Sequence, residues 1–337
     1  NIYSTHQSAM IDGVNVGAFF SGKGYLGGVR ATLHTLLGKG WSSSVYASIK
    51  GGDDLYVGGV YNDALDLALR VSKDFDSGGR FSIVALSALS ERGLRSGTTQ
   101  EVFRLRGDKL YNPTWGNQAG KVRNSRTRED KIPFVMMSYS QPIGSSTRML
   151  LSLGGDYGER NCRNLGWYNA MTPRPDNYRY LPSYYYSEQL ASQVEKVWRA
   201  GDETYTQVNW EELYEQNRIS STGAVYALEG RVERIANASL WLGFHSDISQ
   251  NLSLDYGLRV KYEDSRNFKR MEDLLGALYL RDVDYYLMDD DTFSGNLQNN
   301  MRNPDHRVSV GDRFSYDYSL RSRESLVALL TGGCAKQ

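Results

Sequence analysis

Residues 252–262 alternate between apolar and polar side chains without a break, and this pattern restricts the possible folds more than any other feature of the chain. The apolar set is Leu252, Leu254, Tyr256, Leu258, Val260 and Tyr262, and the positions between them are mostly charged. A period of two places the two sets on opposite faces of a β-strand. At roughly 3.3 Å per residue and a tilt near 40°, such a strand spans about 27 Å of height, which matches the hydrocarbon core of a bilayer.

The alternation recurs along the chain, so we expect an all-β fold of about ten long antiparallel strands. It is clear in residues 61–72 and 238–245, and further candidate strands are residues 14–20, 25–37, 41–50, 80–90, 131–141, 148–157 and 314–330. Short turns are expected at residues 38–40, 74–79, 142–147 and 247–250, and longer loops at 51–58, 91–130, 158–231 and 264–312. Short connections on one side and long ones on the other are typical of a transmembrane β-barrel with extracellular loops.

The composition agrees with a barrel and argues against other classes. Hydrophobic residues make up 40% of the chain and no run of about 18 apolar residues occurs, so a helical membrane protein is excluded. The mean hydropathy of −0.52 is compatible with a barrel, because lipid-facing residues alternate with polar ones. Lys and Arg together number 39, as do Asp and Glu, so no global field favours a nucleic-acid partner.

Three short helices are expected inside the long loops. Leu190, Val194, Val197 and Trp198 have helical spacing and precede Gly201. Asn209, followed three residues later by Glu212, resembles a capping box, and Met271, Leu274, Leu275 and Leu278 form a third apolar stripe. These helices are expected to fold over the mouth of the sheet.

The sequence offers no catalytic constellation, cofactor motif or metal motif. His6, His34, His245 and His306 are scattered without metal-ligand spacing. An acidic loop could hold calcium through carboxylate oxygens, but it lacks the EF-hand pattern and its glycine. A solvated charge run is the favoured interpretation of this loop, which contains Asp282, Asp284, Asp289, Asp290 and Asp291, and calcium binding there stays open.

Two loops have the aromatic and arginine density that binding surfaces use. They cover residues 110–126 and 165–185. The candidate substrate-binding residues are Trp115, Arg123, Trp167, Arg174, Tyr178, Arg179 and Tyr184. The alternative, held equally, is that these loops pack on themselves and are stiffened by their prolines.

At these two loops the sequence resembles the TonB-dependent outer-membrane receptors that carry a carboxypeptidase-like regulatory domain ahead of their plug. The matching stretches are residues 111–116, 121–126, 167–170, 173–176 and 178–184, and residues 273–276, 303–308 and 311–312 fit a later loop of the same family. The resemblance implies a barrel of about 22 strands in the outer membrane of a Gram-negative bacterium. It further implies a plug domain, energy from the TonB complex, and uptake of a nutrient rather than enzymatic activity. The nutrient itself stays unknown.

We therefore expect residues 1–337 to be a partial receptor barrel in contact with outer-membrane lipid, without a signal peptide, plug domain or TonB box. Its sheet is expected to be an open half-cylinder, with unpaired edges near residues 14–20 and 314–330. One alternative is a complete small barrel acting as an adhesin or enzyme, which requires its first and last strands to pair. Another is a soluble β-rich binding protein, whose apolar face would pack on a second sheet.

Overall fold

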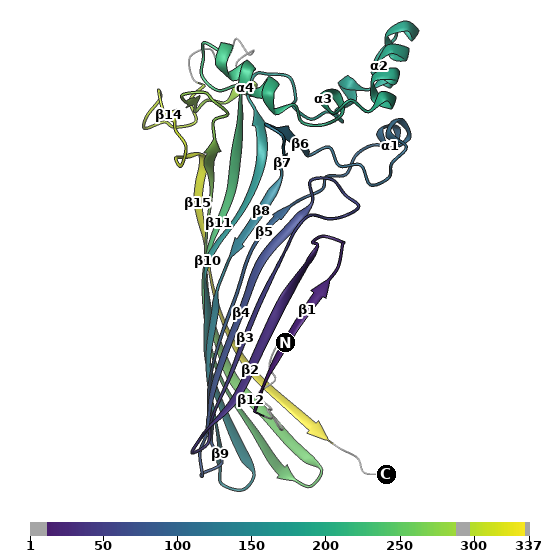
Figure 1. Cartoon of the computed structure of the whole chain (residues 1–337). Helices are drawn as coiled ribbons and strands as arrows, with labels where there is room; N and C mark the ends of the chain where they lie inside the picture. The colour runs from purple at the N-terminus through teal and green to yellow at the C-terminus, as the bar shows by residue number, and fades with distance from the viewer. Residues whose placement is uncertain (1–11, 288–296, 334–337) are drawn as a thin grey trace.

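A single curved antiparallel sheet dominates the computed structural model, which describes residues 12–287 and 297–333 (Figure 1). Its strands are β1 (Gly13–Phe20), β2 (Gly27–Gly38), β3 (Trp41–Gly51), β4 (Tyr61–Asp74), β5 (Arg80–Gly93), β8 (Thr127–Lys131), β9 (Phe134–Ile143), β10 (Thr147–Trp167), β11 (Tyr226–Ser249), β12 (Leu252–Asp273) and β15 (Arg313–Gly333). Both β8 and β9 lie between β5 and β10, so they share one strand position. Pro133 falls between them, where a residue without an N–H interrupts the ladder. The prediction of about ten strand positions is confirmed.

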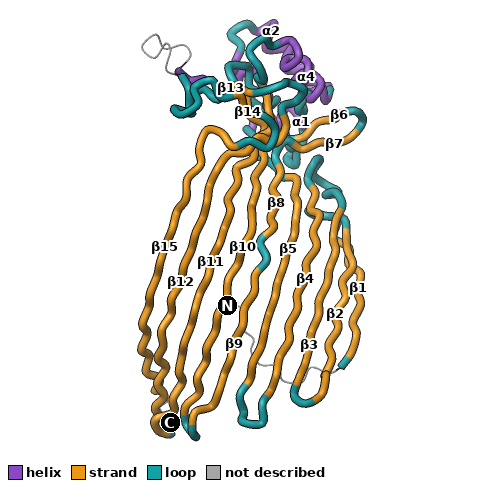
Figure 2. The backbone as a smooth tube through the Cα atoms, turned by 90° about the vertical axis from the view of Figure 1, so that its left-hand side faces the viewer, coloured by secondary structure: helices purple, strands orange, loops and turns teal. Residues whose placement is uncertain are grey.

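The strands follow one another in chain order across the sheet (Figure 2). In the described part of the chain, β1 pairs only with β2 and β15 pairs only with β12. The expected open sheet is therefore confirmed, and the pairing of first and last strands that a complete small barrel requires does not occur between these segments.

The two faces of the sheet differ in chemistry as the alternation predicts. Leu151 and Leu153 on β10 are 38% and 47% exposed on the outer face. Ser152, between them, faces the other way and pairs with Ser138, whose hydroxyl lies 2.7 Å from that of Ser82. Small, largely buried hydroxyl side chains thus line the face on which the sheet curls inward, which we call the concave face.

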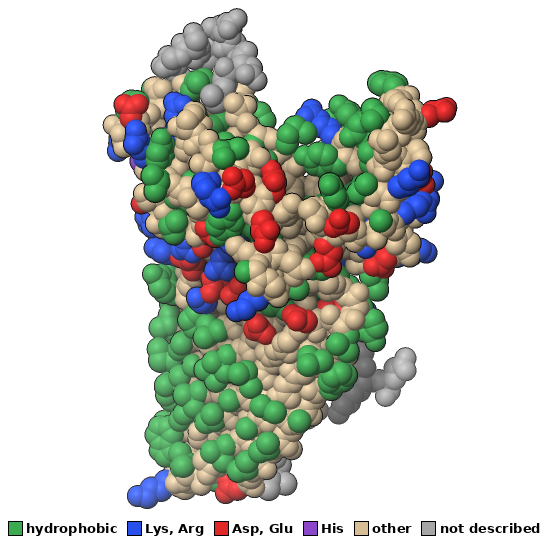
Figure 3. Space-filling model, turned by 45° about the horizontal axis from the view of Figure 1, so that its top comes forward, with side chains coloured by type: hydrophobic (Ala, Val, Ile, Leu, Met, Phe, Trp, Pro, Cys, Tyr) green, Lys and Arg blue, Asp and Glu red, His purple; other side chains and the backbone are tan. Residues whose placement is uncertain are grey.

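Hydrophobic side chains gather over the lower part of the visible surface, and charged ones gather above them (Figure 3). We call this lower region the apolar belt; its outward side chains include Leu65, Leu151, Leu153, Leu240 and Leu258, all exposed. The other described sheets are two-stranded pairs within the loops, so no second sheet covers the belt. This arrangement differs from a soluble sandwich. No helix in residues 12–287 or 297–333 is both long and apolar enough to cross a membrane.

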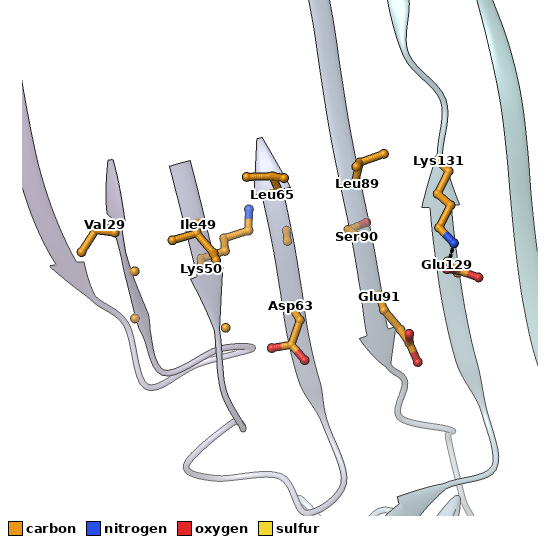
Figure 4. A pocket seen from close by; sticks show the side chains of 14 residues that line it. Val29, Ile49, Lys50, Asp63, Leu65, Leu89, Ser90, Glu91, Glu129 and Lys131 are labelled. Atoms are coloured by element: carbon orange, nitrogen blue, oxygen red, sulfur yellow. Dashed lines mark ion pairs between the residues drawn. The ribbon is translucent and has the colours of Figure 1, made fainter. Parts of the chain in front are cut away.

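Figure 4 shows the upper boundary of the belt in a groove of about 680 Å³ on the outer face. Its apolar row consists of Val29, Ile49, Leu65 and Leu89, and the adjoining charged row consists of Asp63, Glu91 and Glu129, while Lys131 stands level with Leu89 and pairs with Glu129. Because side chains two residues apart share a face, these rows are successive levels of the same surface. The change from apolar to charged side chains marks where the surface leaves the hydrocarbon.

The four strands β10, β11, β12 and β15 continue well above this boundary, so the long loops begin later than residues 158 and 264. Ion pairs across neighbouring strands stabilise the extension. Arg234 and Arg270 lie 3.0 and 2.8 Å from the carboxylate of Glu159. Although burial opposes the effect, hydrogen bonds from these two guanidinium groups hold the pKa of Glu159 below its usual value.

Short turns gather at one end of the sheet, while the long loops and all the helices gather at the other (Figure 1). The loop helices are α1 (Gln100–Arg106), α2 (Glu188–Ala200), α3 (Glu203–Thr206), α4 (Trp210–Ile219) and the 3₁₀ turns η1 (Tyr178–Tyr180), η2 (Pro182–Tyr184) and η3 (Tyr285–Leu287). Four short strands lie among them: β6 (Trp115–Gln118), β7 (Lys121–Asn124), β13 (Leu280–Arg281) and β14 (Arg307–Val308). We call this assembly the loop cap.

Two of the three expected helices are confirmed. The first is α2, which ends at Gly201 with a left-handed φ of 76°. The second is α4, where the Asn209 side chain accepts a hydrogen bond from the Glu212 N–H at 3.2 Å. The third prediction is wrong, because Met271 is still part of β12 and a turn follows it. Met271 and Leu274 are buried in one core cluster and Leu275 in a second, while Leu278 is exposed, so the spacing does not mark one face of a helix.

Candidate functional site

The loop cap has a hydrophobic core of its own, and one of the candidate residues helps to build it. Trp210 is 0% exposed, and the Arg123 guanidinium stacks 4.3 Å from the centre of its ring. The Trp210 indole N–H donates to the Arg123 carbonyl oxygen at 3.2 Å, while the Arg123 side chain pairs with Asp273 at 2.7 Å. These contacts join β7, α4 and the end of β12, so Arg123 serves to hold the cap together.

Trp115 and Arg174 are also engaged within the cap. A Cβ atom added to Gly58 would come within 2.9 Å of the Trp115 ring, so glycine is needed for this close approach. Arg174 makes two hydrogen bonds to the buried carboxylate of Asp176, at 3.0 and 2.9 Å. Both side chains thus make contacts within the cap, as the alternative interpretation expects, and their part in substrate binding stays a prediction.

The amide side chain of Asn217 connects α4 to the sheet by hydrogen bonds. The Asn217 amide nitrogen donates to the carbonyl oxygens of Tyr226, Leu274 and Leu275 at 2.8, 2.8 and 3.1 Å. Its oxygen accepts from the N–H groups of Val225 and Tyr226, both at 2.9 Å. A buried amide that uses its hydrogen-bonding capacity in this way fixes the position of the helix on the ends of β11 and β12.

Three of the candidates come together on the surface of the cap. The rings of Tyr178 and Tyr184 lie 5.6 Å apart, edge to face, and the two side chains are 56% and 49% exposed. Arg179 lies over the Tyr178 ring at 5.8 Å, and Tyr185 packs edge-on against Tyr184 at 5.5 Å. We call Tyr178, Arg179, Tyr184 and Tyr185 the tyrosine patch.

The backbone holds this patch in place. Asn177 caps η1 by accepting from the Arg179 N–H at 3.1 Å. The Ser183 N–H donates to Glu101 of α1 at 3.0 Å, so η2 is tied to a neighbouring helix. Exposed rings on a tethered turn are suited to recognise a ligand with little loss of conformational entropy. Trp167 lies apart, 44% exposed at the end of β10.

The acidic loop uses its described carboxylates internally. Asp282 is buried and lies 3.0 Å from His306 Nδ1 and 3.1 Å from the Asn299 amide. Asp284 accepts from the Tyr286 N–H at 3.0 Å. Asp289, Asp290 and Asp291 lie outside the described residues. Within residues 12–287 and 297–333, no three His, Cys, Asp or Glu side chains are grouped to hold a metal ion.

A second set of polar residues, which no sequence pattern indicated, lies on the concave face beneath the cap. Arg92, Arg128, Arg231 and Lys269 lie on four different strands, and only the register of those strands aligns them. The sequence signal for them is weak, because each is one charged residue in a stretch where both faces carry charge.

No protein-family model matches the sequence, and a search of curated proteins finds no match. Solved structures do resemble the chain. The open form of the ferric-catecholate import receptor Fiu from E. coli K12 has a TM-score of 0.52 and 7% identity, with 97% of this chain and 52% of that chain covered. The siderophore receptor PiuA from Acinetobacter baumannii has a TM-score of 0.48 and 9% identity, with 95% of this chain covered. The ferric preacinetobactin receptor BauA from the same organism has a TM-score of 0.46 and 12% identity, with 91% of this chain covered.

The chain spans about half of Fiu, and 39% and 36% of the PiuA and BauA chains. The likeness to Fiu defines the class at the level of fold: an antiparallel transmembrane β-barrel segment of the kind found in import receptors. The expected fold class is therefore confirmed.

Proposed function

We propose that this chain forms part of the barrel of an outer-membrane receptor that takes up a nutrient. The observation that carries the proposal is the division of one sheet into an apolar outer face, a small and polar concave face, and loops gathered over one end. A surface with an exposed apolar belt is stable only against lipid. A polar concave face beneath a capped mouth is suited to a solute pathway, and no reaction is needed to account for it.

In this proposal the receptor is a TonB-dependent one, as the loop resemblance implies. Its partners are then the TonB complex and a plug domain against the concave face. Its location is the outer membrane of a Gram-negative bacterium. The same proposal has residues 1–337 as a single partial-barrel domain. It also gives the tyrosine patch a role in nutrient binding.

The test uses cells that express the protein in a defined medium, with depletion of solutes measured by mass spectrometry. One class of solute should be depleted in cells with an intact TonB complex and spared in cells without it. Equal depletion in both strains would contradict TonB-dependent uptake.

Replacing Tyr178 and Tyr184 together by Ala should lower this uptake roughly thirtyfold, since two exposed aromatic anchors that each contribute about 1 kcal/mol together contribute about 2 kcal/mol. Tyr205→Ala is the matched control, because Tyr205 is an exposed tyrosine of the same cap outside the patch. Uptake that is equally low in the control would remove the patch from the binding surface.

A further inference from the structure

Directly below the loop cap, four cations form one row across the concave face. Arg92 on β5 pairs in register with Arg128 on β8, and Arg128 pairs with Cys162 on β10. Cys162 pairs with Arg231 on β11, which in turn pairs with Lys269 on β12. Side chains of residues paired in this way lie on the same face, with Cβ atoms roughly 5 Å apart.

The row belongs to the concave face. Cys162 stands at an even-numbered position of β10, like Ser152, whereas the outward Leu151 and Leu153 occupy odd positions. Side chains alternate strictly along a regular strand, so the same face is followed from Ser152 up to Cys162.

Carboxylates on this part of the face do not balance the positive charge. The row and the levels directly below and above it hold six cations and three carboxylates: Arg92, Arg126, Arg128, Arg160, Arg231 and Lys269 against Asp130, Glu229 and Glu233. Asp130 is shared by Arg92, Arg128 and Arg160, at 3.8, 2.7 and 2.9 Å. Arg160 also pairs with Glu233 at 2.9 Å, and Lys269 pairs with Glu229 at 2.7 Å. Among the described residues, Arg231 has no ion-pair partner.

This arrangement is costly unless an anion completes it. Like charges directly opposite each other on neighbouring strands destabilise a sheet, and the row contains two such pairs, Arg92 with Arg128 and Arg231 with Lys269. A pocket of about 350 Å³ opens beside the row and is lined by Arg126, Arg160, Arg231, Asn164 and Tyr316, among others. Its volume is that of a small-ligand site.

We infer that this pocket and the cation row bind a small ligand with several phosphate or carboxylate groups. Planar guanidinium groups recognise both kinds of group through paired hydrogen bonds, and Asn164 and Tyr316 add neutral hydrogen-bonding groups at the pocket wall. The inference deepens the proposed uptake function by naming the chemical class of the solute, and it rests on that function for its meaning in the cell.

Binding is tested with the intact receptor of which this chain forms part, extracted from the outer membrane in detergent, using inorganic pyrophosphate and citrate as probes in calorimetry. At least one probe should bind, and higher salt should weaken its binding. Arg231→Gln should weaken it roughly tenfold or more, since hydrogen bonds to charged groups contribute about 1.5–3 kcal/mol. Arg321→Gln is the matched control, because Arg321 pairs with Asp264 at an exposed position away from the row.

Arg92→Gln is a second variant, and unchanged heat-modifiable migration of the intact receptor on gels shows that each variant is folded. Preference for pyrophosphate over citrate, or the reverse, identifies the anionic group. No binding of either probe by the unaltered protein, or equal losses in Arg231→Gln and Arg321→Gln, would overturn the inference. TonB-dependent depletion of an uncharged solute would leave the uptake proposal standing and refute only the ligand class.

Discussion

Leu151→Arg should strongly reduce the amount of protein that assembles in the outer membrane, whereas Ser152→Arg should leave it nearly unchanged. The two residues are neighbours on β10 at the same height, but Leu151 belongs to the apolar belt and Ser152 to the concave face. An arginine on the lipid-facing side near the middle of the bilayer costs about 2–4 kcal/mol. The concave face already carries an arginine at this height. Ser152 is in register with Trp241 on β11, and Trp241 is in register with Arg259 on β12.

The measurement is the quantity of folded, heat-modifiable receptor containing this chain in the outer-membrane fraction, with total synthesis as the reference. Ser152 is a better control position than a glycine such as Gly257, where an added Cβ would lie 2.5 Å from the Leu242 carbonyl oxygen. Equal assembly of the two variants would show that the outer face of β10 does not meet lipid.

Trp210→Ala should loosen the loop cap while the strands in the membrane stay intact. Trp210 is fully buried, stacks on Arg123 and donates a hydrogen bond to the Arg123 backbone, so its loss creates a large cavity at the centre of the cap. Truncating a buried tryptophan to alanine costs about 3–5 kcal/mol. That free energy is a large fraction of the stability of any single domain.

Protease added to intact cells measures the effect, because the loop cap is expected to face outside. Cleavage within the cap segments 94–126 and 168–225 should become much faster in Trp210→Ala. Trp167→Ala should behave like the unaltered protein, since Trp167 is 44% exposed. If the two tryptophan variants were cut at the same rate, the cap core would not depend on Trp210.

The strands could be predicted from the sequence because alternation is a local property. Residues 252–262 show both the strand and its two faces without knowledge of any neighbour, and β12 contains them as expected. The upper ends of the long strands were not predicted, because charged residues above the belt are stabilised by partners on other strands. Glu159, for example, depends on Arg270, which lies 111 residues further along the chain.

The roles of the candidate binding residues were harder to predict for the same reason. Arg123 has the composition of a binding residue, but its partners Trp210 and Asp273 come from distant segments and give it a packing role. Tyr178, Arg179 and Tyr184 form a patch because they are close in sequence and share one tethered turn. The cation row needed the register of five strands, which the sequence alone does not provide.

The most direct test of the membrane-spanning sheet is lipid contact along β12, measured one residue at a time. Single cysteines replace Tyr256, Leu258 and Val260 on one face and Asp255, Arg259 and Lys261 on the other, in protein whose Cys162 and Cys334 are changed to Ser. Each cysteine carries a fluorophore, and lipids bearing a nitroxide quench those fluorophores that touch the bilayer. Strong quenching at 256, 258 and 260 with weak quenching at 255, 259 and 261 is the predicted result. Equal quenching on both faces, or stronger quenching at the charged positions, would contradict a sheet whose outer face meets lipid.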